Sequence, residues 1–444
     1  MKAGILSLSR LYARAKESRF SRNVLWNVLG GVTSKITGPI FAILVARLIE
    51  PRDYGVFAIG VAVAAFFQIG KDLGLSQAII VDDKNDEHLS LQFTVQLSWA
   101  CLVYAVLYVL SPYVALAYGD APELVSVLRI LGLGFFVAAV VDPYATHHLK
   151  QQNYRFLFIR QVVPTVVGGI LMLVLAHQGH GVYALVAGTL SSAIAAALVM
   201  AWGAGVLPRL TVNWPLLRRL FRLGKHITLQ EFAGYLVQQA DSIIVGRNLG
   251  PAMAGLYKIG NTIALIIPNS ISSQIQQVVF TDMAERRKDP DFMVRRYYQF
   301  VNLVGSGSLL FSVLLYLLAP TLVPMFLGEQ WQGTISVIQV FVIVIPFVPL
   351  VLLNLNISKI LGFNHIYSLF VVGRSLLTIT VVVILSFHSL MAVVVGWVTV
   401  GMATSVVNAL LFFRYQRIIP PSKGLVALFI AGMGWGVIAI ATTV

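Results

Sequence analysis

The sequence has few charged residues and a single cysteine. Asp, Glu, Lys and Arg together make up 11% of its 444 residues, whereas 58% are hydrophobic, and the mean hydropathy is +0.82. A water-soluble protein of this length could not bury so much apolar surface, so a soluble globular fold is excluded. Cys101 has no second cysteine to pair with and lies in an apolar run, which predicts a buried, unreactive thiol.

The sequence also lacks the motifs that mark most enzymes. It has no Walker loop, no G-x-S-x-G elbow and no His-Glu-x-x-His motif, and its histidines form no cluster with metal-ligand spacing. We therefore expect no enzymatic activity, no cofactor and no metal centre. If the protein transports something, a gradient or the chemical potential of the substrate must drive the process.

Apolar runs of about 20 residues recur along the chain and predict transmembrane helices. Most of the 32 Lys and Arg residues fall in the connections on one side, whereas the opposite side holds only Arg47, Arg52 and Arg247. This asymmetry predicts a multi-pass membrane protein with its N-terminus in the cytoplasm. It also explains the net charge of +14 without nucleic acid as a partner.

One segment of the chain occurs twice. Residues 42–60 read AILVARLIEPRDYGVFAIG, and residues 242–260 read SIIVGRNLGPAMAGLYKIG. Without a gap, the two copies align three pairs of turn residues: Arg47 with Arg247, Pro51 with Pro251, and Gly55 with Gly255. A duplicated helix pair in a membrane protein is typical of transporters, in which two similar bundles face each other across a substrate cavity.

We therefore predict an all-α polytopic membrane protein, with two repeat-related six-helix bundles and about 12 to 14 transmembrane helices around a central cavity. Thirteen spans can be read from the sequence, and the last leaves the total open between 12 and 14. The predicted parts are a basic cytoplasmic or interfacial segment (1–22), an N-terminal bundle (23–205), a cytoplasmic linker (206–225), a C-terminal bundle (226–413) and an additional C-terminal helix (414–444).

Charged groups at membrane depth are costly unless they face protein or water, so they are candidates for function. Lys35 lies near the middle of the first predicted span, with Asn27 near the same helical face. A cation on a small, polar stripe suits an anionic ligand. The alternative is a structural ion pair between Lys35 and either Asp72 or Asp241.

Three further predicted helices carry polar stripes, and we expect all four repeat-related helices to line one substrate-binding cavity. Arg374 either lines the mouth of this cavity or extends to the lipid headgroups. We expect interfacial or structural roles for Arg129, Asp142 and Arg160. The complete predicted cavity set is Asn27, Lys35, Lys71, Asp72, Gln238, Asp241, Lys258, Asn269 and Arg374.

The segment LVARLIEPRDYGVFAIG, followed by KDLGLSQAII and an acidic DDKNDEHLS loop, resembles the N-terminal region of bacterial polysaccharide transporters. These are the O-antigen and exopolysaccharide flippases of the multidrug/oligosaccharidyl-lipid/polysaccharide exporter superfamily. The second copy, GRNLGPAMAGLYKIGN, resembles the corresponding region of their second bundle. That family usually has 12 or 14 helices, so thirteen spans would be a departure.

The resemblance implies a V-shaped pair of bundles around a central cationic cavity. It also implies that a polyprenyl-pyrophosphate-linked oligosaccharide moves from the inner to the outer leaflet by alternating access, for surface polysaccharide biosynthesis. Lys35 and Lys71 would face the pyrophosphate, and Asp72 or Asp241 could bind a coupling proton or sodium ion. Membrane lipids and the polymerase and glycosyltransferase proteins of the same pathway are the further partners that this reading implies.

Three alternatives remain. An ion-coupled drug exporter of the same superfamily would need an acidic pocket for cationic drugs, and the intramembrane balance here is at least as basic as acidic. A polysaccharide polymerase or ligase would need a large catalytic outer loop, and the predicted outer loops near 112–123 and 319–332 have no basic residue or histidine. A structural scaffold would not need charges at mid-membrane.

Overall fold

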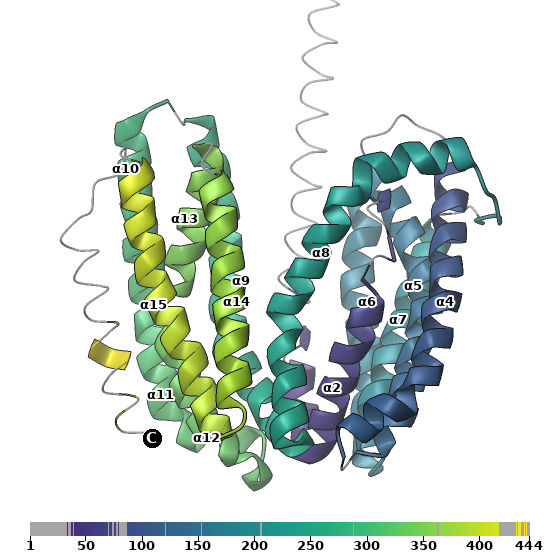
Figure 1. Cartoon of the computed structure of the whole chain (residues 1–444), viewed down its shortest axis with the longest axis horizontal. Helices are drawn as coiled ribbons and strands as arrows, with labels where there is room; N and C mark the ends of the chain where they lie inside the picture. The colour runs from purple at the N-terminus through teal and green to yellow at the C-terminus, as the bar shows by residue number, and fades with distance from the viewer. Residues whose placement is uncertain are drawn as a thin grey trace, which may run out of the picture. The chain divides into compact units, whose positions relative to one another are not determined.

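A computed structural model describes most of the chain beyond its first 32 residues (Figure 1). The described residues are 33, 37, 38, 40–69, 71, 72, 75, 76, 79, 87–119, 121–151, 153–204, 207–286, 288–361, 364–416, 432, 434–436, 439 and 441. Asn27 and Lys35, as well as the whole predicted segment 1–22, lie outside them.

The chain divides into two compact units. Unit 1 comprises Met1–Ile49 and Gly60–Leu236, and unit 2 comprises Glu50–Ile59 and Val237–Val444. Helix α2 (Pro51–Phe67) therefore belongs to both units, because its first residues pack in unit 2. The predicted linker 206–225 is helical from Trp214 onward, where the long helix α8 begins.

Unit 1 contains four long apolar helices. They are α4 (Glu87–Ala117), α5 (Glu123–Lys150), α6 (Tyr154–His177) and α7 (Val182–Ala204), and the first part of α8 (Trp214–Leu249) joins them. Helix α5 packs against α4 and α7, and α6 packs against α7. Small residues let α6 and α7 approach closely, since a Cβ on Gly168 would lie 2.6 Å from the carbonyl oxygen of Gly188.

Unit 2 contains the remaining helices and the end of α8. They are α9 (Pro251–Glu285), α10 (Pro290–Phe300), α11 (Ser306–Phe326), α12 (Gly333–Phe341), α13 (Val348–Ile360), α14 (Asn364–Leu385) and α15 (Leu390–Gln416). Short 3₁₀ turns occur at Glu329–Trp331 and Val342–Val344. One part of the core joins Tyr297 of α10 to Phe412 of α15, whose rings stack with centroids 5.5 Å apart.

Two apolar spans of unit 2 are not continuous α-helices. A π-helical turn, Val301–Gly305, joins α10 to α11, so that Pro290–Phe326 forms one long apolar span. The span made by α12 and α13 is bent by 40°. Pro346 lies in this break and Pro349 in the first turn of α13, and proline removes backbone donors that an unbroken helix would need.

The two copies of the repeat begin their helices at matching residues. Helix α2 begins at Pro51 and α9 begins at Pro251, where each proline occupies a first-turn position that needs no N–H donor. The helices then cross at their glycines: a Cβ on Gly55 would overlap the carbonyl oxygen of Pro251, and one on Gly255 would overlap that of Pro51. Only glycine permits this reciprocal approach of two backbones.

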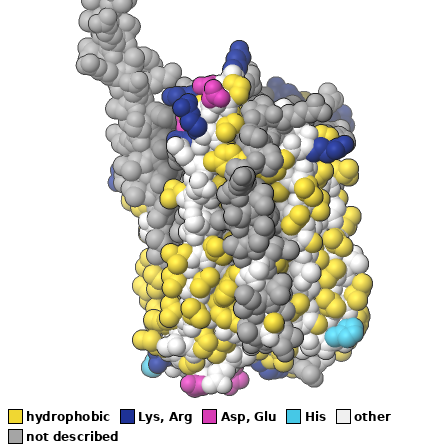
Figure 2. Space-filling model, turned by 90° about the vertical axis from the view of Figure 1, so that its left-hand side faces the viewer, with side chains coloured by type: hydrophobic (Ala, Val, Ile, Leu, Met, Phe, Trp, Pro, Cys, Tyr) yellow, Lys and Arg dark blue, Asp and Glu magenta, His cyan; other side chains and the backbone are white. Residues whose placement is uncertain are grey.

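Many large hydrophobic side chains of the described residues are exposed, as a lipid-facing surface requires. Among the described residues, six helices are long and apolar enough to cross a membrane, or seven if the bent α12–α13 pair counts as one span. Figure 2 shows one face on which hydrophobic side chains form a broad band and charged side chains gather toward the two ends. Cys101 is exposed on α4, so the prediction of a buried thiol is wrong: an apolar run in a membrane protein can face lipid.

Candidate substrate cavity

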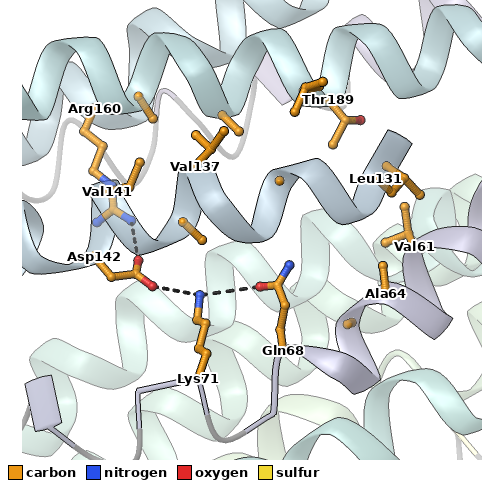
Figure 3. A pocket seen from close by; sticks show the side chains of 16 residues that line it. Val61, Ala64, Gln68, Lys71, Leu131, Val137, Val141, Asp142, Arg160 and Thr189 are labelled. Atoms are coloured by element: carbon orange, nitrogen blue, oxygen red, sulfur yellow. Dashed lines mark hydrogen bonds and ion pairs between the residues drawn. The ribbon is translucent and has the colours of Figure 1, made fainter. Parts of the chain in front are cut away.

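A cavity of about 360 Å³ lies inside unit 1 (Figure 3). Small and aliphatic side chains of α2, α5 and α7 form most of its wall, among them Ala64, Gly134 and Ala193. The polar wall consists of Gln68 and Lys71, just after the end of α2, together with Asp142 of α5, Arg160 of α6 and Thr189 of α7. Small residues on three helices leave the space, and five polar groups give it chemical character.

The charged groups of the cavity converge on one carboxylate. The Nζ atom of Lys71 lies 2.8 Å from one oxygen of Asp142, and an Nη atom of Arg160 lies 3.8 Å from the other. Lys71 also donates a hydrogen bond of 3.4 Å to Oε1 of Gln68. Two cations therefore face a single carboxylate, and the three side chains are 21–34% exposed. These three side chains carry one net positive charge, which suits an anion.

Next to Lys71, Asp72 points into a separate buried network. Its carboxylate accepts hydrogen bonds from the amide and hydroxyl of Ser76 and from the side-chain amides of Gln92 (3.0 Å) and Gln96 (2.8 Å) on α4. Thr146 of α5 donates to Ser76 and accepts from Gln92. The Oε1 atoms of Gln92 and Gln96 are buried without a partner. The bonds to Asp72 fasten the segment after α2 to α4, and the bond from Thr146 to Ser76 fastens it to α5.

In addition to the cavity wall and the Asp72 network of unit 1, unit 2 contains a third cluster of polar side chains. Asp241 of α8 accepts a 2.7 Å hydrogen bond from the hydroxyl of Tyr257 on α9 and a 2.7 Å bond from the backbone amide of Ser242. Lys258, the residue after Tyr257, is half-buried and acts on Asp241 electrostatically. These contacts join α8 to α9 just beside the crossing of Gly55 and Gly255.

The structure thus distributes the predicted cavity residues among separate groups. Lys71 lines the cavity of unit 1, Asp72 lies in the adjacent network, and Asp241 and Lys258 lie in unit 2. Arg374 is half-buried on α14. For Gln238 and Asn269 only the helical backbone is described, and Asn27 and Lys35 lie outside the described residues. A single site that unites all nine stays a prediction.

Two charged residues of the cavity wall and three of the buried network lie outside the predicted cavity set. Asp142 and Arg160 were expected to be interfacial or structural because they lie near helix ends, yet they line the cavity with Lys71. Gln92, Gln96 and Thr146 lie outside the repeated segment, and nothing links them to Asp72 in sequence. The useful signal was available in part: Gln92 and Gln96 share one face of α4 at a spacing of four residues.

Two curated proteins resemble the chain at low identity. It is 22% identical over 323 residues to the lipopolysaccharide biosynthesis protein WzxC of Escherichia coli (strain K12), covering 72% of this chain and 65% of that protein. It is 23% identical over 320 residues to the succinoglycan biosynthesis transport protein ExoT of Rhizobium meliloti (strain 1021), covering 70% of this chain and 63% of that protein. The chain thus spans just under two thirds of the length of these relatives.

Solved structures share the fold. The lipid II flippase MurJ, in an inward closed conformation, superimposes with a TM-score of 0.73 at 11% identity, covering 95% of this chain and 96% of that one. The predicted fold class, an all-helical membrane protein built from two repeat-related bundles, is therefore confirmed. The family model described as "polysaccharide biosynthesis protein" matches residues 44–336. Because this match covers more than half of the chain and includes parts of both units, the chain belongs to the polysaccharide biosynthesis protein family.

Proposed function

We propose that this protein is a lipid-linked oligosaccharide flippase. In this proposal it moves polyprenyl-pyrophosphate-linked glycan repeat units from the inner to the outer leaflet of the bacterial cytoplasmic membrane by alternating access, for the synthesis of surface polysaccharide. The cationic cavity of unit 1, set in a fold shared with a lipid II flippase, is the observation that carries the proposal. The names of the curated relatives support it, because one refers to lipopolysaccharide biosynthesis and the other to transport in succinoglycan biosynthesis.

The cavity chemistry matches the charged part of such a substrate. A pyrophosphate diester carries two negative charges, and Lys71 and Arg160 together supply two cations with donor groups suited to phosphate oxygens. Asp142 holds these cations while the cavity is empty, so an entering pyrophosphate must compete with it. This competition lets the site bind the substrate and also release it on the other side.

The remaining parts of the proposal follow from the membrane. The lipid tail stays in the bilayer, since transferring a polyprenyl chain into water would be very costly. The N-terminus lies in the cytoplasm, because most Lys and Arg residues fall on that side. The protein then has no catalytic step of its own, and its partners are the enzymes that make the lipid-linked repeat unit and those that polymerise it.

The basic balance of the cavity argues against the export of cationic drugs. A pocket for such drugs needs carboxylates that remain unpaired, whereas the carboxylate of Asp142 already contacts two cations. A drug-susceptibility panel on a deletion strain tests this alternative directly.

A deletion strain also tests the main proposal. Lipids are extracted, and the polyprenyl-pyrophosphate oligosaccharides are identified by mass and assigned to a leaflet by their accessibility to an external glycosidase. The proposal expects the lipid-linked unit to accumulate on the inner leaflet while the surface polysaccharide disappears. Normal surface glycan without accumulation would contradict it. If single repeat units reached the outside but no polymer formed, a polymerase would be the better assignment.

A further inference from the structure

An extended segment of unit 1, residues 207–213, is fastened along the beginning of α4. The backbone amide of Arg209 donates a 3.1 Å hydrogen bond to the hydroxyl of Ser90, and that of Thr211 donates a 3.0 Å bond to the hydroxyl of Thr94. The side chain of Asn213 donates a 2.7 Å bond to Glu87. Three bonds at alternate residues hold this extended segment, which we call the strap, in a defined position with one edge against α4.

The strap and the first residue of α8 expose bulky apolar side chains. Leu207 is 83% exposed, Leu210 is 71%, Val212 is 61% and Trp214 is 63%. Within the next two turns of α8, Leu216 and Leu220 are buried in a core cluster with Leu75, Ile79 and Leu91. The exposed residues therefore do not result from loose packing, because the chain on both sides of Trp214 is well anchored.

The anchor points place the strap at the level of the membrane interface. Helix α4 has 31 residues and is about 46 Å long, whereas the hydrocarbon core of a bilayer is about 30 Å thick. Ser90 and Thr94 lie within about 10 Å of the helix start, at 1.5 Å per residue. In Figure 1 the beginning of α8 lies near this end of α4. The strap therefore runs along the boundary between headgroups and acyl chains.

Basic side chains accompany the apolar ones. Arg209, Arg218 and Arg219 are exposed in or just after the strap, and they all lie within ten residues of Leu210. Segments that lie in the interface of anionic membranes typically combine exposed apolar side chains, such as leucine, valine and tryptophan, with arginine. A protein partner would also cover apolar residues, but it would not account for their position at the depth of the headgroups.

We propose that the strap is a membrane-surface anchor that binds anionic phospholipid. Leu207, Leu210, Val212 and Trp214 insert at the headgroup and acyl boundary, and the arginines contact lipid phosphates. The anchor fixes unit 1 to the cytoplasmic leaflet. This inference concerns the membrane itself and does not depend on which substrate the cavity carries.

Fluorescent labelling of single-cysteine variants tests the insertion. In a Cys101→Ala background, an environment-sensitive fluorophore is attached at Leu210→Cys, and the purified full-length protein is reconstituted in vesicles of phosphatidylcholine with phosphatidylglycerol. Lys288→Cys, in an exposed turn, is the aqueous reference, and Leu102→Cys, exposed on α4, is the membrane reference. We expect iodide to quench the probe at position 210 at least about threefold less than the probe at position 288. A nitroxide-labelled lipid near the headgroups should quench it strongly.

Two outcomes would overturn the proposal. Equal iodide quenching at positions 210 and 288 would mean that the strap lies in water. Shielding of position 210 in native membranes but not in vesicles of the purified protein would assign the surface to a protein partner. Both comparisons are made only in preparations in which the variant labelled at position 102 is shielded from iodide, because that shielding shows that the protein is correctly inserted.

Charge substitutions test the lipid class. Arg209→Gln and Arg218→Gln keep long polar side chains but remove the cation, and the phosphatidylglycerol fraction that gives the half-maximal emission shift at position 210 is measured. We expect that fraction to rise up to about fivefold for each arginine removed. The shift in the parent should also weaken at high salt, because salt screens exposed charges. An unchanged half-point in both variants would contradict binding to anionic lipid.

Discussion

Gly55 and Gly255 are related by the sequence repeat and lie against each other's helix, each facing the backbone carbonyl of the other copy's proline. Nearby, the ring of Tyr54 packs edge-on against Trp331 at 5.8 Å, which fixes the start of α2 in unit 2. The first copy of the repeat therefore begins its helix inside the unit that contains the second copy. A pattern found in sequence thus corresponds to a direct contact in space.

Alanine at either glycine should destabilise the protein. A methyl group at position 55 or 255 would overlap a backbone carbonyl, so the helices must separate, and overpacking of this kind costs about 1–3 kcal/mol. Thermal unfolding of the purified protein would measure the loss. The control is Gly307→Ala on α11, where a Cβ meets nothing within 4 Å and alanine favours the helix. Equal unfolding temperatures for Gly55→Ala and Gly307→Ala would contradict the close crossing.

The double variant Gly55→Ala/Gly255→Ala extends this test. One separation of the helices accommodates both methyl groups, so the two losses should not add. The combined loss is expected to be clearly smaller than the sum of the single losses. Additive losses would indicate that the two glycines act at independent contacts.

Asp142 should limit the affinity of the cavity for anions. Asp142→Asn frees Lys71 and Arg160 from their carboxylate, so binding of a soluble polyprenyl-pyrophosphate analogue should tighten about tenfold. Lys71→Gln should weaken it by a similar factor. Microscale thermophoresis in detergent would measure both, with Lys288→Gln, which removes an exposed lysine outside the cavity, as the neutral control. If neither charge variant altered the affinity, the anion would bind elsewhere.

We expect Asp72 to contribute mainly to stability. Asp72→Asn places an amide donor where the carboxylate accepts bonds from Gln92, Gln96 and Ser76, and breaking such a buried network costs about 2–4 kcal/mol. Its unfolding temperature should fall well below that of Lys71→Gln. A different outcome, with full stability but no transport, would instead favour the coupling-ion role that the sequence suggested for Asp72.

Tyr257→Phe should destabilise the junction of α8 and α9. The hydroxyl of Tyr257 donates to the carboxylate of Asp241, and a hydrogen bond to a charged group contributes about 1.5–3 kcal/mol. The repeat supplies a matched comparison, since Phe57 already occupies the equivalent position in the first copy. Phe57→Tyr should bring no gain, because the first copy has Phe41 where the second has the carboxylate of Asp241. Chemical or thermal unfolding of both variants would measure the change in stability that each substitution causes.

Removing the bonds of the strap should loosen its backbone. Ser90→Ala with Thr94→Val deletes the acceptors for Arg209 and Thr211, and each lost bond contributes about 1 kcal/mol. Hydrogen exchange of residues 207–213 should accelerate by roughly fivefold or more, while α5 remains unchanged. Unchanged exchange would mean that the membrane, and not α4, holds the strap.

The sequence was sufficient for the long apolar helices that the structure describes and for the repeat, because both depend on local patterns. Apolar length identifies a transmembrane helix, and the duplicated Pro51 and Pro251 mark two helix starts. The side on which a residue lies depends on neighbours far away in the chain. Cys101 faces outward although its surroundings are apolar, because in a membrane protein apolar sequence does not distinguish lipid from core.

The chemistry of the cavity was only partly predictable for the same reason. Lys71 was identified from its depth, whereas its partner Asp142 follows 71 residues later on another helix and looked like an ordinary helix-end charge. Asp72 was grouped with Lys71 because they are adjacent, yet the turn after α2 points them into different surroundings. Adjacent residues outside a regular helix carry no information about a shared direction.

The reciprocal glycine crossing also bears on how this chain arose. Two contacts that exchange roles on swapping the copies, Gly55 on Pro251 and Gly255 on Pro51, have the pattern of an isologous interface between identical subunits. A half-length ancestor with this turn could have made the same contact with a second copy of itself. Gene fusion would then have turned a symmetric dimer into one polypeptide, after which each half was free to acquire its own side chains, as Tyr257 and Phe57 now differ.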